Sequence, residues 1–427
     1  MTSALSVLDI PPEITSTIFL HSVQSLESYG PEDTLPRLSP YEPPLLFGTI
    51  CRQWRSVALS TPELWDSIQV DCPYLIEDVV PAVERWLLRS GSLPLSIGIR
   101  YQVHPDTSSD DLLRLLRRHS AQLQNLTLTI PAYDLYRFPE IVGPLPSLKK
   151  LVVTCLTLRA YGAQRLSAFG FAPELRDIRF TTSFSPSSMA LPWEQLTTFR
   201  ADTLRSSQAL HVLSLSSALV NCRFDLYEDT KPLTPLPLHL HLKSFILRGT
   251  VTSTDLLAQL TTPALTHLEV QGVDLDLWCA FLARSGCTLK HLSIETTGWT
   301  SAMFIQGLNS LSSLTELEVW RPGPSVYHLI RLLNTLPRFL PHLRVFDEDP
   351  GFRDYPPLRD AADLGQSLIE MLEKRWHSNG NARLERFSLY ETDQLVGSPD
   401  LLRRLQALVE NGMKVHISGS ESWDATV

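Results

Sequence analysis

Leu242-Lys-Ser-Phe245-Ile-Leu247 is the first of four copies of one motif, followed by Leu265-Thr-His-Leu268-Glu-Val270, Leu289-Lys-His-Leu292-Ser-Ile294 and Leu314-Thr-Glu-Leu317-Glu-Val319. The copies begin 23, 24 and 25 residues apart. Apolar residues occupy the first, fourth and sixth places, with mostly polar residues between them. Because successive side chains of a strand point to opposite faces, each copy predicts a short β-strand with one apolar face. One strand cannot bury that face alone, so the copies must stack side by side.

Seven weaker copies extend the motif in both directions: Leu123-Gln-Asn-Leu126-Thr-Leu128, Leu148-Lys-Lys-Leu151-Val-Val153, Leu175-Arg-Asp-Ile178-Arg-Phe180, Leu196-Thr-Thr-Phe199-Arg-Ala201, Leu219-Val-Asn-Cys222-Arg-Phe224, Leu343-Arg-Val-Phe346-Asp-Glu348 and Leu384-Glu-Arg-Phe387-Ser-Leu389. Eleven copies in one chain are not a chance occurrence. A period of about 20 to 29 residues resembles that of leucine-rich-repeat proteins, which implies a curved parallel sheet inside and helices outside. The predicted fold class is therefore α/β, with a helical N-terminal module before an irregular solenoid.

The composition of the chain excludes several classes of protein. The chain has 427 residues, 43% hydrophobic residues and a net charge of −9, which argues against general nucleic-acid binding because that needs a basic surface. The sequence contains no apolar run near the ~20 residues of a membrane helix and no secretory signal pattern, so we expect an intracellular protein, cytoplasmic or nuclear, without a membrane partner. Six cysteines without a Cys-x-x-Cys pair predict reduced core thiols.

The N-terminal region predicts two helices. Prolines at 11 and 12 fit the first turn of a helix over about 11–24, whose apolar face carries Ile14, Ile18 and Phe19. Residues 25–44 contain five prolines and predict a long loop. Helical spacing over 45–59 predicts the second helix. Ser60 or Thr61 is expected to be the N-cap of a further helical turn that begins at Pro62. Leu64 and Trp65 then lead into a predicted strand at 68–70.

The N-terminal sequence contains, in order, Ile10-Pro-x-Glu-Ile14, Ile18-Phe19, Ile50-Cys-Arg-x-Trp54-Arg and Leu64-Trp65. It resembles an F-box through these residues, and its pattern is close to that of fungal F-box proteins. The resemblance covers about residues 8–66. It implies docking to a Skp-family adaptor, and through it to a cullin, of a ubiquitin ligase whose substrate protein is held by the repeats. By matching position, the residues that would face the adaptor or shape that face are Ile10, Pro11, Ile14, Ile18, Phe19, Ile50 and Trp54. Ile10 stands where the family usually has leucine, and the 25–44 loop is longer than in the compact module.

Spacing alone leaves a second interpretation open. Two amphipathic helices before a solenoid can simply cap it, because a terminal repeat exposes an apolar edge that needs covering. The chain would then be a protein-interaction scaffold with no adaptor.

The predicted domains are a flexible end at 1–9, an F-box-like helical module at 10–68, a solenoid at 69–418 and a flexible end at 419–427. The solenoid contains an insertion at 347–383, which consists of a polar loop followed by a helix over about 361–376. Many leucine-rich repeats carry an asparagine three residues after the sixth place, and here none does. We therefore expect neighbouring turns to be held mainly by packing.

Catalytic and cofactor-binding patterns are missing from the sequence. It has no Gly-rich phosphate loop, no paired cysteine or histidine metal spacing and no nucleophile elbow, so we expect no enzymatic activity and no cofactor. His267 and His291 occupy the third place of successive motifs, where they could stack on the inner face and bind a metal, but two ligands seldom make a metal site.

The concave face of the sheet is the candidate substrate surface, because places three and five of each motif point to it. Place five carries Arg179, Arg200 and Arg223 in successive motifs, then Glu269 and Glu318 further on. Adjacent strands lie about 4.8 Å apart, so the arginines predict a basic stripe of roughly 10 Å followed by an acidic one. The predicted substrate-binding residues are Arg179, Arg200, Arg223, Glu269, Glu316, Glu318 and, as an apolar anchor, Trp320. The alternative is a solvated face on which charges of one sign cluster by accident.

Overall fold

The computed structural model describes residues 10–24, 35–72, 79–101, 110–155, 167, 169–182, 185–227, 239–249, 253–272, 274–321, 325–349, 361–377, 382–390, 399–418 and 423–424. The predicted flexible end at 1–9 lies outside these ranges, as do residues 25–34 of the predicted loop and most of 419–427. The chain divides into two compact units, Met1–Thr203 and Leu204–Val427.

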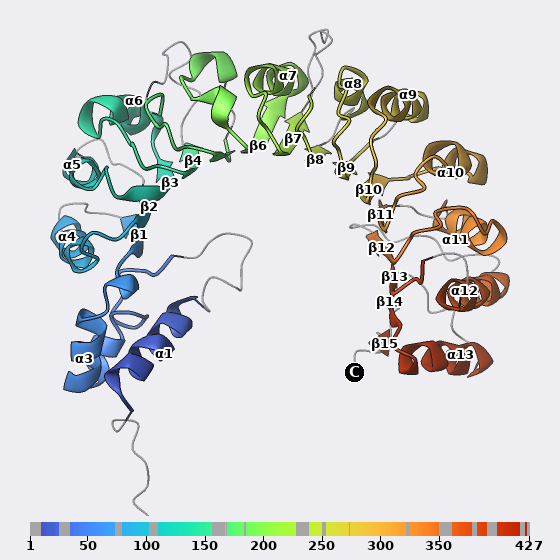
Figure 1. Cartoon of the computed structure of the whole chain (residues 1–427), viewed down its shortest axis with the longest axis horizontal. Coiled ribbons are helices and arrows are strands. Elements are labelled where there is room, and N and C mark those ends of the chain that lie inside the picture. The colour runs from blue at the N-terminus through green and yellow to red at the C-terminus, as the bar shows by residue number, and fades with distance from the viewer. Residues whose placement is uncertain are drawn as a thin grey trace, which may run out of the picture. The chain divides into compact units, whose positions relative to one another are not determined.

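The first unit holds a helical module and a parallel sheet (Figure 1). Its helices are α1 (Pro12–Gln24), α2 (Phe47–Ile50), α3 (Arg52–Leu59), α4 (Val80–Arg89), α5 (Asp110–Arg118) and α6 (Ala132–Ile141), with 3-10 turns η3 (Pro62–Leu64), η5 (Pro186–Ser188) and η6 (Trp193–Gln195). Its strands, in sheet order, are β1 (Ser67–Cys72), β2 (Leu95–Tyr101), β3 (Leu123–Ile130), β4 (Lys150–Cys155), β5 (Asp177–Phe180) and β6 (Thr198–Arg205).

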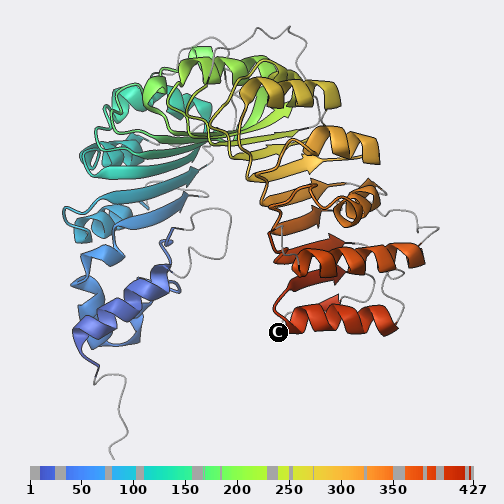
Figure 2. The same ribbon diagram turned by 45° about the vertical axis from the view of Figure 1, so that its right-hand side comes forward.

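The second unit repeats the same arrangement (Figure 2). Its strands, in sheet order, are β7 (Asn221–Tyr227), β8 (Ser244–Gly249), β9 (His267–Val270), β10 (His291–Glu295), β11 (Glu316–Trp320), β12 (Val345–Asp349), β13 (Arg386–Tyr390), β14 (Lys414–Ser418) and β15 (Trp423–Asp424). Its helices are α7 (Ser206–Leu215), α8 (Ser253–Ala258), α9 (Leu275–Ser285), α10 (Ser301–Leu308), α11 (Ser325–Thr335), α12 (Ala361–Trp376) and α13 (Pro399–Glu410). In both units the helices after β1 cover one face of the strands; we call the other side the open face.

Strand register confirms the prediction from the motif. The fourth places of neighbouring motifs are direct partners, as in Phe245 with Leu268 and Leu292 with Leu317, and these side chains are at most 1% exposed. Apolar residues at places four and six therefore line one continuous interior beneath the helices, while places three and five lie on the open face. This strand-and-helix repeat is the architecture of a leucine-rich-repeat array.

Three local predictions need correction. The predicted helix over 45–59 is split at Cys51, whose extended backbone (φ −155°) lets its sulfur accept a hydrogen bond from Trp54 N and cap α3. Thr61 does not cap the next turn, because its hydroxyl donates to Val57 O instead. Residues 423–424 are part of β15, which pairs antiparallel with β14. A return strand of this kind covers backbone groups that an edge strand would leave open.

The predicted insertion at 347–383 begins within β12 and contains α12. Asp347 to Asp349 belong to β12, where Asp347 accepts hydrogen bonds from Arg386 and Ser388 on β13. The helix expected over 361–376 is confirmed as α12, and it packs between α11 and α13.

The helical module packs directly on the first repeat, across the predicted boundary at 68/69. Trp65 is 2% exposed, its ring centroid lies 4.9 Å from that of Trp86 on α4, and its Nε1 donates to Ala58 O on α3. Leu64 beside it is fully buried. Module and array thus share one core within the first unit.

Side chains tie neighbouring repeats together at the loops that follow the helices, which adds to the packing expected from the sequence. Arg284 at the end of α9 donates to Leu257 O and Leu260 O of the preceding repeat. Gln195 donates in the same way to Ala172 O and Leu175 O. These side-chain bonds supply a donor to Leu260 O and Leu175 O, and a second donor to Leu257 O and Ala172 O, which also accept a backbone hydrogen bond.

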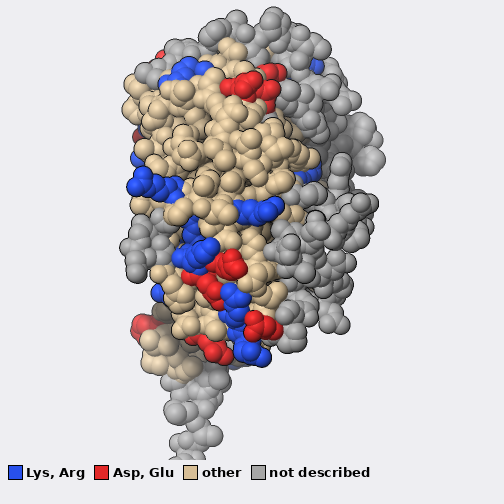
Figure 3. All heavy atoms as spheres, turned by 90° about the vertical axis from the view of Figure 1, so that its right-hand side faces the viewer, with Lys and Arg blue, Asp and Glu red and all other residues tan. Residues whose placement is uncertain are grey.

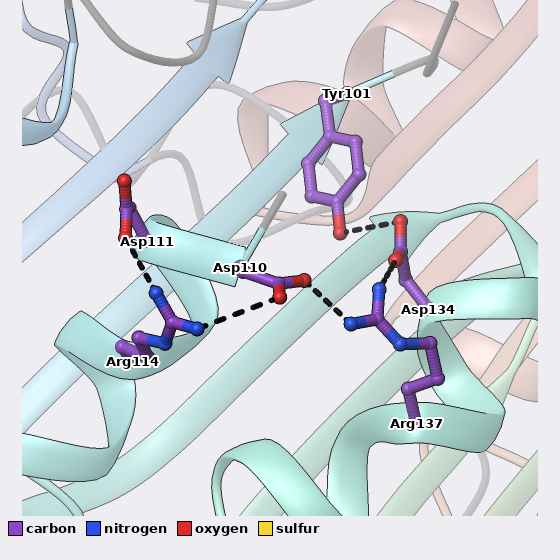
Figure 4. Close-up of polar contacts among 6 residues, drawn as sticks. All are labelled: Tyr101, Asp110, Asp111, Arg114, Asp134 and Arg137. Carbon is purple, nitrogen blue, oxygen red and sulfur yellow. Dashed lines mark hydrogen bonds and ion pairs between the residues drawn. The ribbon is translucent and has the colours of Figure 1, made fainter. Parts of the chain in front are cut away.

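A polar network joins β2 to α5 and α6 in the first unit (Figure 4). The buried Tyr101 hydroxyl donates to Asp134 Oδ2 at 3.0 Å, and Arg137 lies 3.7 Å from Asp134 and 2.7 Å from Asp110. Burial alone would lower the pKa of Arg137, but the hydrogen bond and charge of Asp110 raise it above its ordinary value. Arg114 extends the network to Asp110 and Asp111 on the surface.

We expect Tyr101→Phe to lower the free energy of unfolding by about 1–3 kcal/mol, because it removes one donor from a carboxylate that is only 2% exposed. Urea unfolding followed by circular dichroism measures the change. Tyr133→Phe is the matched control, since Tyr133 lies on α6 with 53% of its surface exposed. Equal midpoints for the two variants would contradict a structural role for the hydroxyl.

Candidate functional site

The outer surface of the helical module is apolar at three isoleucines. Ile14 and Ile18 lie one turn apart on α1 and are 54% and 50% exposed, and Ile50 at the end of α2 is 53% exposed. Ile14 and Ile18 share one face of α1, and exposed aliphatic side chains that share a face are typical of interaction surfaces. We call these three residues the isoleucine patch.

Aromatic residues beneath the isoleucine patch fix the helices to one another. Phe19 is 2% exposed and stacks on Phe47 with ring centroids 3.9 Å apart, and Trp54 meets Phe19 edge-on at 5.0 Å. The spacing grouped Phe19 with Ile14 and Ile18 on one face, but the structure turns Phe19 inward. Ile10 is half-buried and Pro11 is exposed at the start of α1.

A polar hollow of about 650 Å³ lies on the open face of the first unit. Its charged lining residues are Arg37, Asp71, Arg100, Lys150, Asp177, Arg179, Arg200 and Asp202. The predicted arginines Arg179 and Arg200 are register partners on β5 and β6, so the structure brings these two together. Five of these side chains are cationic and three are acidic, so the hollow has an excess of two positive charges.

Residues 35–37 reach the hollow because they run beside β1. Gln69 N donates to Pro36 O at 2.7 Å, and Arg37 forms a parallel bridge with Gln69. Gly98 on β2 leaves room for this contact: a Cβ there would lie 2.0 Å from Gln69 Oε1 and 3.2 Å from Leu35 Cδ1. The long loop thereby places a cation of the helical module on the repeat sheet.

Ion pairs within the hollow do not neutralise all its cations. Arg37 and Arg100 both lie 3.9 Å from the single carboxylate of Asp71, and Arg179 lies 3.3 Å from Asp202. Arg200 is exposed and has no acidic partner within ion-pair distance in the described ranges. Two ends of the hollow therefore carry excess positive charge, since Arg37 and Arg100 share one carboxylate at one end and Arg200 lies at the other.

The open face of the second unit carries the other predicted residues, most of them paired. Arg223 Nε lies 3.5 Å from Asp225, Glu269 pairs with Arg248, and Glu316 shares a 3.0 Å hydrogen bond with His291. The hydrogen bond from Arg248 to Glu269 raises the pKa of the guanidinium above its ordinary value.

Trp320 and Glu318 complete the predicted set. The Arg248 guanidinium lies 5.2 Å from the Trp320 ring centroid and covers the proposed apolar anchor. Glu318 is half-buried, with Asp347 as its register partner on the next strand.

Other charges are mixed in sign. On the face drawn in Figure 3, the described lysine and arginine side chains lie among aspartates and glutamates without a broad area of one sign. His267 and His291 stack with ring centroids 5.6 Å apart. The described parts of the chain contain no group of three side chains placed to hold a metal ion. None of the described helices is long and apolar enough to cross a bilayer.

Comparisons with known proteins add little to this geometry. No protein-family model matches the chain, and no curated protein does. Among solved structures, the leucine-rich repeat-containing protein LegL7 from Legionella pneumophila is similar over 64% of this chain and 84% of its own, with 14% identity and a TM-score of 0.35. Neither value ties the two proteins to a common activity.

Proposed function

We propose that this chain is a protein-binding scaffold that acts as an F-box substrate receptor. The helical module docks a Skp-family adaptor of a cullin-containing ubiquitin ligase, and the open face of the repeats holds a substrate protein. The chain itself performs no chemistry. The isoleucine patch is the observation that supports this proposal most directly, because these residues match F-box positions and remain exposed above a sealed aromatic core.

A scaffold whose helices only cap the array is the second candidate. The contact between Trp65 and Trp86 favours it, since it shows the module covering the first repeat. Capping needs the buried aromatics, however, and does not need exposed isoleucines. Substitutions at the surface therefore distinguish the two candidates.

The test is capture of a recombinant Skp-family adaptor by the full chain. Ile14→Asp and Ile18→Asp, each at a half-exposed position, should weaken capture by roughly 30-fold or more, as expected for central interface residues. Leu88→Asp is the matched control, because Leu88 is 69% exposed on α4, outside the module. Unfolding midpoints should stay close to that of the parent chain in all three variants.

Two outcomes would contradict adaptor docking. One is no capture by the parent chain, and the other is capture that both isoleucine variants retain at the level of Leu88→Asp. Either would leave the capping scaffold as the function.

A further inference from the structure

The hollow on the open face of the first unit has the charge pattern of a peptide site. We propose that it binds an extended segment of a partner protein that carries acidic residues at two points about five or six residues apart. This inference rests on the protein-binding part of the proposed function and names the chemistry of the segment that is bound.

The sign of the ligand follows from the local charge. The chain as a whole has a net charge of −9, whereas the hollow has five cations and three acids. A local excess of the opposite sign attracts and orients an anionic partner. Arginine also presents a planar fork that donates two parallel hydrogen bonds to one carboxylate, and four of the five cations are arginines.

The spacing follows from the sheet. Arg100 lies on β2 and Arg200 on β6, which is four strand intervals away. At about 4.8 Å for each interval the two strands are roughly 19 Å apart, and an extended peptide advances about 3.4 Å per residue. Acidic residues five or six positions apart would therefore reach both ends.

Four threonine hydroxyl groups lie between those ends. Thr127 and Thr129 on β3 and Thr154 on β4 line the hollow, and the Thr154 and Thr181 hydroxyls lie 2.5 Å apart. Hydroxyls can donate to carbonyls and accept from amides, so these groups suit a peptide backbone.

Two other anions fit less well. A single phosphate cannot reach both ends of a hollow about 19 Å long. A nucleic acid would bring a continuous run of phosphates against Asp71, Asp177 and Asp202, which lie among the cations. An acidic peptide can place its charges only where the cations are.

Fluorescence anisotropy with the full chain tests the proposal. The probe is a labelled peptide, Glu-Glu-Ser-Ala-Ser-Ala-Glu-Glu, compared with the same peptide carrying lysines for the glutamates and with one whose four glutamates are contiguous. The split acidic peptide should bind most tightly, and its binding should weaken as salt is raised.

Single charge reversals locate the binding. Arg100→Glu and Arg200→Glu should each weaken binding about tenfold, the effect of one charge-assisted hydrogen bond. Arg403→Glu is the control, because its side chain is 76% exposed on α13 in the second unit. Equal loss in all three variants, or equal binding of the lysine peptide, would overturn the proposal. Full displacement of the peptide by inorganic phosphate alone would replace it with a small-anion site.

Adaptor capture and peptide binding, both measured with the parent chain, separate this inference from the proposed function. A parent chain that captures the adaptor but does not bind the split acidic peptide refutes the peptide site and leaves adaptor docking in place. Peptide binding without capture supports the peptide site and refutes adaptor docking.

Discussion

Replacing Arg375 with methionine is expected to lower the free energy of unfolding by about 2–4 kcal/mol, because buried carbonyls lose their donor and each unsatisfied group costs about 1–3 kcal/mol. Arg375 lies at the end of α12 and is 3% exposed. Its guanidinium donates to three carbonyls of the preceding repeat: Leu333 O at 3.2 Å, Leu340 O at 3.1 Å and Phe339 O at 2.6 Å. Methionine fills the space of the stem but removes the donor from Leu333 O and Phe339 O, while Leu340 O keeps only its bond from Leu343 N.

Chemical unfolding of the full chain measures this effect. Arg403→Met is the control at a side chain that is 76% exposed, and it should change stability by less than about 0.5 kcal/mol. Arg375→Lys should fall between the two, because an ammonium keeps the charge without the planar fork. If Arg375→Met and Arg403→Met behave alike, the guanidinium does not hold the repeats together.

The repeat sheet was predictable because its signal is local and periodic. Leu268 and Val270 read as strand residues from six positions of sequence, and their burial follows from stacking with the next copy. Arg375 carried no such signal. It reads as an ordinary basic residue in the last turn of a helix, and its acceptors lie 35 to 42 positions earlier in the chain.

The candidate hollow was predictable in part for the same reason. Arg179 and Arg200 follow from place five of the motif, and Lys150 sits at place three of its copy, where the same rule could have found it. Arg37 could not be found, because it belongs to a loop without periodicity that reaches β1 by a contact between distant residues. The ion pairs depend on register, which single motifs do not specify.

The module shows a different limit of periodicity. Helical spacing groups Ile14, Ile18 and Phe19, yet only Phe19 is buried. The inward direction is set by Phe47 and Trp54, which come from helices across the long loop. The spacing of the sequence identifies the apolar positions of α1, and the packing of Phe47 and Trp54 against this helix decides which of these positions remain exposed.

Gly249→Ala is expected to destabilise the second unit by about 3 kcal/mol or more, from backbone strain and overpacking together. Gly249 ends β8 with φ +133°, a conformation that residues with a side chain rarely adopt. A Cβ there would lie 2.0 Å from Leu226 O on β7, and the atom in its way is backbone that no rotamer change can move. Alanine must therefore push β8 away from β7.

Gly286→Ala separates the collision from the backbone strain. Gly286 also has a positive φ, +55° after the end of α9, but nothing lies within 4 Å of a Cβ built there. It should cost only about 1–2 kcal/mol, the penalty for the left-handed conformation. Thermal or urea unfolding of both variants measures the difference. Because β7 and β8 carry Arg223 and Ile246 as register partners, a shift between these strands would also distort the open face there. Equal midpoints for the two variants would contradict the close approach of Leu226 O to Gly249.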